Sequence, residues 1–182
     1  MRPLAHHEAK LLRKVDFLSW AGDDTREAGI IRRYALRDRA EYMAYNKLAG
    51  AVTGLATKLK ALPAGNPVRV KATEQLLAKL YAMGVIPTAT SLAQVEKLSA
   101  SAFARRRLPV VLMRLKFAET LREACTLVEH GHIRVGPEVV TDPAFIVTRT
   151  FEDFITWVDS SKIKRTVARY NDRLDDYELL GE

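Results

Sequence analysis

The segment 105–158 constrains the fold most, because its apolar residues change their spacing partway along. Before Gly131 they recur every three or four positions, which is the period of a helix buried on one side. Directly after Gly131, apolar and polar residues alternate, which is the period of a half-buried strand. Gly136 and Pro137 then favour a turn. The pattern predicts two short helices followed by a tight β-hairpin.

The two predicted helices each carry a start signal. The first opens with Leu108 and Pro109, since proline is tolerated in a first helical turn. The second opens with Thr120, which has Glu123 at capping-box spacing. The buried residues expected are Leu108, Val111, Leu112 and Leu115 in the first helix, and Leu121, Ala124, Cys125 and Val128 in the second. Arg114 is left on the outside.

The hairpin is predicted from alternating side chains. His132 and Arg134 alternate with Ile133 and Val135, so one pair is expected to face outward and the other inward. The return strand is expected at 139–140, and a last strand at 151–158.

The first part of the chain shows only helical patterns. A long helix is expected from Glu27 to Pro63, followed by helices at 69–83 and from Ser91. The apolar stripe expected in the long helix is Tyr45, Leu48, Val52, Leu55, Leu59 and Leu62. An apolar cluster at Val15, Phe17, Leu18 and Trp20 is expected to dock on the protein's own core.

These patterns predict an α+β fold in three parts. Residues 1–104 form an N-terminal helical region, 105–158 form two short helices packed on a small sheet, and 159–182 form a helical tail. Hydrophobic residues make up 48% of the 182-residue chain, which is enough for a real core.

Charge and composition narrow the class of function. Lys and Arg number 29 against 22 Asp and Glu, a net charge of +7 that suits a polyanionic partner. The single cysteine, Cys125, argues against a disulfide framework and a multi-cysteine metal site. No apolar run is long enough for a membrane span, and no secretory signal is present, so we expect a soluble intracellular protein without a membrane partner.

Catalysis is the weak hypothesis. Neither glycine-rich phosphate-loop motif occurs, and Cys125 lies on the predicted buried stripe, where a thiol is inert. We therefore expect no enzyme activity, no cofactor, no metal and no small-molecule substrate.

RNA binding is the stronger hypothesis, because basic side chains converge on the segment 105–158. Arginine offers a planar fork to phosphate oxygens and can stack on bases, and histidine can do either. The candidate RNA-binding residues are Arg105, Arg106, Arg107, Arg114, Lys116, Arg122, His132 and Arg134. They are expected on adjoining surfaces of the two helices and the first hairpin strand.

Residues 106–147 also resemble the α-L RNA-binding motif, the domain named after ribosomal protein S4. The resemblance rests on E-x-L-R-E-A, on the block H-G-H-I-R-V-G, and on V-V-x-D-P-A-F-x-V. Pro109 stands where many such domains carry Asp, and Val135 where Asn is common. The resemblance implies a non-catalytic RNA-binding domain.

Four further blocks resemble a narrower family. They are KVDFLSW at 14–20, KLYAMGVIPT at 79–88, RRRLP at 105–109 and TWVDSSKIKR at 156–165. This is the Imp-three family, the S4-like proteins of the U3 small nucleolar ribonucleoprotein. Membership implies a nucleolar, and so nuclear, factor of the small-subunit processome. Its implied partners are U3 small nucleolar RNA, precursor small-subunit rRNA, and a processome protein of the M-phase phosphoprotein-ten type.

Two alternatives stay open at this point. The chain could be a protein-interaction scaffold or a stable small-subunit ribosomal protein, docking through the cluster at 17–20 and the C-terminal helix. An enzyme that borrows the domain, as pseudouridine synthases do, is disfavoured because no catalytic domain is left over.

Overall fold

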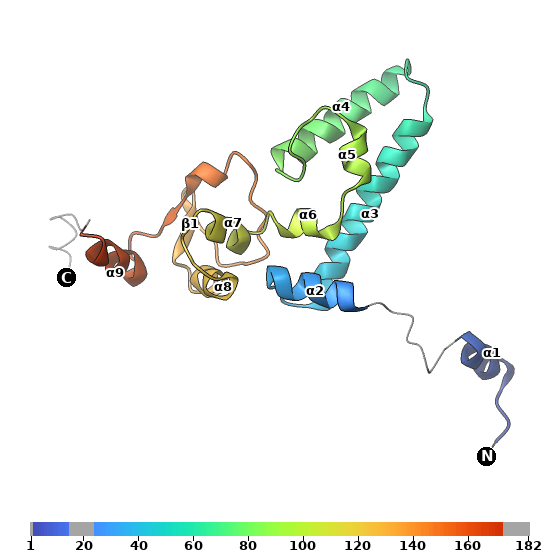
Figure 1. The fold of residues 1–182 in the computed structure, drawn as a ribbon, viewed down its shortest axis with the longest axis horizontal. Helices are drawn as coiled ribbons and strands as arrows, with labels where there is room; N and C mark the ends of the chain where they lie inside the picture. Colours follow the sequence, from blue (N-terminus) through green and yellow to red (C-terminus); the bar gives the residue numbers. More distant parts are fainter. Residues whose placement is uncertain (1, 15–23, 173–182) are drawn as a thin grey trace.

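The computed structural model describes residues 2–14 and 24–172, and within these ranges the predicted α+β class is confirmed. The elements are α1 (His6–Lys14), α2 (Asp24–Tyr34), α3 (Arg39–Ala61), α4 (Pro67–Ala82), α5 (Leu92–Glu96), α6 (Ala100–Ala104), α7 (Leu108–Arg114), α8 (Leu121–Glu129), β1 (Ile133–Val135), β2 (Glu138–Val139), the 3₁₀ helix η1 (Glu152–Phe154), β3 (Ile155–Trp157) and α9 (Lys162–Tyr170). In Figure 1, α6 leads into α7, with the sheet and α9 on one side of that junction and the long helices α3 and α4 on the other.

The sheet has the antiparallel order β2-β1-β3, so the predicted hairpin is confirmed and β3 extends it. Arg134 pairs with Val139 of β2 and with Thr156 of β3. Gly136 has φ +62°, a conformation that favours glycine in the turn. The strand expected at 151–158 is shorter than predicted, because η1 occupies residues 152–154 and β3 only Ile155–Trp157.

One core lies between the inner face of this sheet and helices α7 and α8. Leu108, Val111, Leu112, Ala124 and Val128 are buried there, as their spacing predicted, together with Ile133 and Val135 of β1. Leu115 was expected in this core but is 41% exposed. It is the C-cap of α7, and the next residue, Lys116, has φ +64°, so the chain leaves the helix before Leu115 can turn inward.

Helix α8 begins as predicted. The Thr120 hydroxyl accepts a hydrogen bond from the Glu123 N–H at 3.2 Å, while the Glu123 carboxylate accepts one from the Glu119 N–H. Cys125 is only half-buried, and Leu127, which was not predicted, is buried instead.

The prediction of one long helix from Glu27 is wrong in two respects. The helix is interrupted after Tyr34, because Ala35 adopts a left-handed φ of +47° and separates α2 from α3. Its apolar stripe is also displaced, since Leu48 and Leu55 are 44% and 46% exposed while Ala49 and Ala56 are buried. Tyr45 and Leu59 are buried as predicted. Helices α4, α5 and α6 therefore pack on a face of α3 that leucine spacing did not identify.

Helix α4 ends at Met83, followed by Gly84 with φ +71°, as the sequence predicted. A Cβ at Gly84 would lie 2.7 Å from the Arg106 guanidinium carbon, so glycine is required here by the backbone and by the neighbouring side chain. Ser91 caps α5 by accepting from the Ala93 N–H.

The segment 145–149 joins the helical region, which contains α2 to α6, to the sheet region, which contains α7, α8 and the three strands. Phe145 accepts a backbone hydrogen bond from Leu108, and Val147 donates one to Arg106. Arg149 donates from its backbone N–H to Ala82 and from its side chain to the Ile86 carbonyl, and its guanidinium lies over the Tyr81 ring at 4.1 Å. The division into 1–104, 105–158 and 159–182 stays a prediction, and these contacts cross its first boundary.

The apolar cluster predicted at 15–20 lies outside the described residues. Among the helices of the described ranges, none is both long and apolar enough to cross a membrane.

Candidate nucleic-acid interface

Two of the predicted RNA-binding arginines are part of the protein interior. Arg106 and Arg107 are only 5% and 2% exposed, although the sequence placed them on the surface. They lie at the junction between α6 and α7, where helical region and sheet region meet. Arg107 finds its acceptors in the helical region, and Arg106 finds its acceptors in the sheet region. The expectation of exposed side chains is therefore wrong for these two residues.

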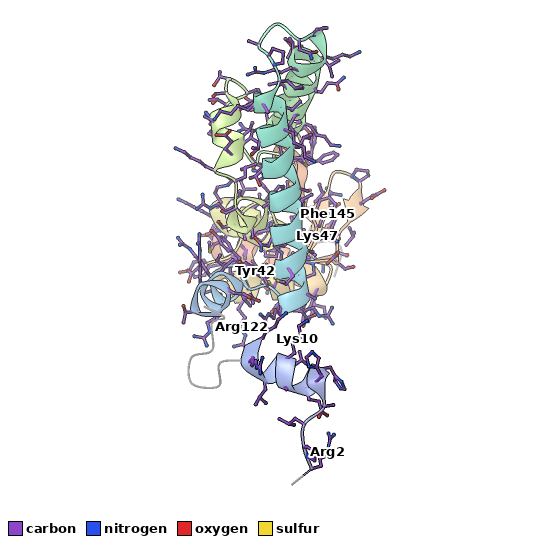
Figure 2. All side chains as sticks on the ribbon, turned by 90° about the vertical axis from the view of Figure 1, so that its right-hand side faces the viewer. Arg2, Lys10, Tyr42, Lys47, Arg122 and Phe145 are labelled. Atoms are coloured by element: carbon purple, nitrogen blue, oxygen red, sulfur yellow. The ribbon has the colours of Figure 1, made fainter. Side chains whose placement is uncertain are left out.

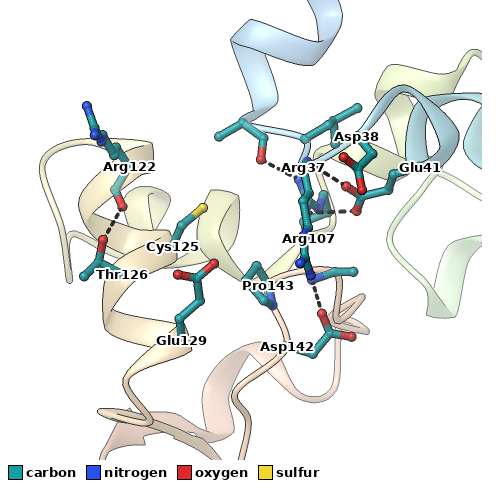
Figure 3. Close-up of a pocket in the computed structure, with 13 residues that line it drawn as sticks. Arg37, Asp38, Glu41, Arg107, Arg122, Cys125, Thr126, Glu129, Asp142 and Pro143 are labelled. Atoms are coloured by element: carbon teal, nitrogen blue, oxygen red, sulfur yellow. Dashed lines mark hydrogen bonds and ion pairs between the residues drawn. The ribbon is translucent and has the colours of Figure 1, made fainter.

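Arg107 ties the turn between α2 and α3 to the start of α7 (Figure 3). Its guanidinium donates to the carbonyl oxygens of Tyr34 and Ala35 at 3.2 and 3.1 Å, and forms an ion pair with Glu41 at 2.9 Å. Burial of Tyr45, with the charge of Glu41 beside it, raises the pKa of the Tyr45 hydroxyl to about 12. This arrangement was not predicted, because Arg107 and Glu41 are far apart along the chain.

Arg106 meets Glu152 of η1. The Arg106 Nε and Nη2 atoms donate to the Val147 carbonyl, at 3.0 and 2.6 Å, and Nη1 pairs with the Glu152 carboxylate. Arg114, which is exposed, pairs with the same carboxylate oxygen. Partial burial opposes ionisation of Glu152, but the hydrogen bond and charge of Arg106, with those of Arg114, hold the pKa of the carboxyl below its usual range.

Arg114, Lys116 and Arg122 lie where α7 ends and α8 begins. All three are exposed, and Lys116 adopts the left-handed conformation that ends α7. Arg122 lies at the rim of a hollow of about 580 Å³ that α8 forms with the α2–α3 turn and the loop Asp142–Ala144 (Figure 3). Arg105, also exposed, donates from Nε to the Tyr34 hydroxyl at 3.1 Å.

Arg134 and His132 occupy the other side of the sheet. Ile133 and Val135 face the core, so Arg134 points to the outer face, where its Nε donates to Thr156 at 2.9 Å. His132 Nδ1 lies 3.0 Å from the Ser161 hydroxyl. The candidate residues are thus divided into a group at the ends of α7 and α8 and a group on the outer sheet face.

The hollow in Figure 3 is lined by charged side chains of both signs and by the Cys125 thiol. Arg37, Asp38 and Glu41 lie on its α2–α3 side, and Arg122 and Glu129 lie on its α8 side. The buried Arg107 forms part of its wall. Burial raises the pKa of the Cys125 thiol, which keeps it protonated and a poor nucleophile. Within the described residues, no group of three or more His, Cys, Asp or Glu side chains could hold a metal ion.

Sequence reasoning overlooked two acidic partners and one basic residue of this surface. Glu152 and Asp159 pair with Arg106, Arg114 and Arg134, and Lys164 pairs with Asp159. The block TWVDSSKIKR contains Asp159 and Lys164, and its charge was the one signal that could have indicated them.

Two family models match the chain, and they adjoin each other. The model of the ribosomal protein S4/S9 N-terminal domain matches residues 3–105, and the S4 domain model matches residues 106–155. The first therefore matches the helical region, and the second ends at the start of β3.

Curated relatives match almost the whole chain. The protein is 54% identical to the mouse "U3 small nucleolar ribonucleoprotein protein IMP3" over 98% of both chains, and 48% identical to the yeast protein of that name over 98% of this chain and 99% of the other. A more distant relative is the small ribosomal subunit protein uS4 of Hyperthermus butylicus, 34% identical over 75% of this chain and 76% of the other. By this similarity along its length, the chain belongs to the IMP3 family of U3 small nucleolar ribonucleoprotein proteins.

Proposed function

We propose that this protein is a non-catalytic RNA-binding factor of the small-subunit processome, acting in small-subunit rRNA processing. The observation that carries the proposal is the 44–54% identity to IMP3 proteins over nearly the whole chain, and not over the S4 domain alone. In this role it binds U3 small nucleolar RNA and promotes its pairing with precursor rRNA in the nucleolus. A companion of the M-phase phosphoprotein-ten type is the protein partner we infer.

The four exposed basic residues, together with the half-buried His132 and Arg134, support backbone binding. We assign RNA contacts to Arg105, Arg114, Lys116, Arg122, His132 and Arg134, and none to the buried Arg106 and Arg107. Guanidinium groups on helix ends and on a sheet face can reach phosphates of a duplex or junction without entering a groove to read bases. Such contacts hold and orient two RNAs while base pairing supplies the sequence specificity.

The test is the salt dependence of binding to a U3 RNA transcript. Each phosphate contact contributes about 0.7 to 0.9 to the log–log slope of affinity against salt. The triple variant Lys116→Ala/Arg122→Ala/Arg134→Ala should bind more weakly with a slope shallower by about 2 to 3.

The matched control is Lys47→Ala/Lys58→Ala/Lys71→Ala, which removes the same charge from exposed positions of α3 and α4. Figure 2 shows Lys47 on α3, among the side chains that project from this long helix. Equal losses in the two triple variants would show that net charge, and not this surface, determines binding.

A second candidate role is a stable small-subunit ribosomal protein. The 34% identity to uS4 over three quarters of the chain favours it. Sedimentation separates the two roles, because a stable component stays with mature small subunits whereas an assembly factor is found only on precursors. Presence of the tagged protein in mature subunits would establish the second role.

A further inference from the structure

Helix α9 carries a stripe of basic residues. Lys162, Arg165 and Arg169 are three and four residues apart, so at 100° per residue they lie within about 60° of one face. The helix contains no acidic residue. It also lies beyond both matched family models, which end at residues 105 and 155, so its surface is additional to that of the S4 domain.

Two polar links fix α9 against the sheet. The Asp159 carboxylate bridges Arg134 of β1, at 2.9 Å, and Lys164 of α9, at 3.3 Å. Ser161 is only 3% exposed; its hydroxyl accepts from the Lys164 N–H at 3.3 Å and lies 3.0 Å from His132 Nδ1. Asp159 and the contact between His132 and Ser161 therefore link α9 to β1.

A third, apolar contact completes the attachment. Ile163 packs against the core between the sheet and α7 and α8. Because Ile163 is on the protein side, Lys162 and Arg165 lie on a different face of the helix. In the described part of the chain neither of these two side chains forms a hydrogen bond or an ion pair, whereas Arg114 and Arg134 both have carboxylate partners.

We propose that α9 is a second RNA-backbone contact, in which Lys162 and Arg165 bind phosphates of a strand that also passes Arg134. The proposal rests on the proposed RNA-binding function and specifies a surface for it. A basic stripe without apolar members suits phosphates, whereas the centre of a protein interface is depleted of lysine and enriched in aromatic residues. The exposed apolar residues of α9, Val167 and Tyr170, lie on the side of Ile163 and not within the stripe.

The experiment compares Lys162→Ala/Arg165→Ala with Lys47→Ala/Lys58→Ala, which removes two positive charges from exposed sites of α3. Binding of the full chain to a U3 RNA transcript is measured by fluorescence anisotropy over a KCl series. The α9 variant should lose on the order of tenfold in affinity, and its salt slope should be shallower by about 1.4 to 1.8. The swap Lys162→Arg/Arg165→Lys keeps both charges and should bind like the parent protein.

Several outcomes overturn the proposal. If the parent protein binds with a normal salt slope and the α9 variant matches the α3 control, then α9 is not an RNA contact, although the proposed function stands. If the parent protein shows no salt-dependent RNA binding, the proposed function fails and this proposal fails with it. If the α9 variant keeps RNA affinity but loses a protein partner on co-purification, the surface serves protein and not RNA. Thermal unfolding and circular dichroism of the variant should match the parent, because in the described part of the chain neither side chain has a hydrogen bond or an ion pair to lose.

Discussion

The spacing of apolar residues predicts burial better in the sheet region than in helix α3. In the sheet region, residues chosen by spacing, such as Val111, Ala124 and Ile133, are fully buried. In α3 the leucines at 48 and 55 are exposed, and alanines at 49 and 56 are buried. The difference lies in the number of neighbours: α7, α8 and the hairpin pack on one another in chain order, whereas α3 contacts α2, α4, α5 and α6. Spacing identifies a buried face reliably only where one face is covered.

The arginines also differ in burial, although they are the same type of residue on neighbouring elements. Arg107 and Arg149 donate to backbone carbonyls across the junction and so connect the two regions, while Arg106 is buried by acceptors within the sheet region. Arg122 and Arg105 are exposed residues of the same type on neighbouring elements. Charge alone does not distinguish a residue that holds the fold together from one available to RNA.

The largest expected change in the free energy of unfolding comes from removing the Arg107 contacts that join the α2–α3 turn to α7. Arg107→Ala removes the partner of Glu41 and leaves the carbonyls of Tyr34 and Ala35 without this donor, so the free energy of unfolding should fall by about 3 to 5 kcal/mol. Urea unfolding followed by circular dichroism measures it. Arg122→Ala is the control, expected within about 0.5 kcal/mol of the parent. Similar losses in the two variants would contradict the structural role of Arg107.

The next effect tests the displaced face of α3. Leu59→Ala should lower the free energy of unfolding by about 3 kcal/mol, because Leu59 is buried against neighbouring elements. Leu55→Ala, four residues earlier on the same helix, should change it by less than about 0.5 kcal/mol because Leu55 is 46% exposed. Thermal or urea unfolding of the pair decides the matter. A larger loss for Leu55→Ala would restore the stripe that leucine spacing predicted.

The smallest effect concerns Glu152 and pH. The pKa of the folded-state carboxyl lies below its ordinary value of 4.5, so its stabilising contribution is fully present above about pH 4.5 and is lost as pH falls through the folded-state pKa. At pH 7, Glu152→Gln should therefore be less stable than the parent, by about 1 kcal/mol or less. The gap should close as the pH is lowered towards 3. A gap that is constant with pH would mean that the ion pairs with Arg106 and Arg114 do not stabilise the fold.

Much of the fold and part of the candidate surface could be predicted. Capping residues placed the starts of α5 and α8, and a proline in the first turn placed the start of α7. Glycines with positive φ lie at the end of α4 and in the hairpin turn. The exposure of Arg105, Arg114, Lys116 and Arg122 agrees with what was expected. The burial of Arg106 and Arg107 could not be predicted, because their acceptors lie about 40 to 70 residues away in the chain.

The sequence by itself determined the local elements, the excess of positive charge and the family, because capping, turn chemistry and apolar period act between residues close in the chain. Only the tertiary structure decided which of three consecutive arginines stay outside, which face of α3 is buried, and that Asp159 and His132 align α9 with Arg134. These features depend on desolvation and on partners brought together by folding. A buried guanidinium is stable only where carbonyls and carboxylates from distant parts of the chain surround it. The spacing of residues along the chain does not predict such contacts.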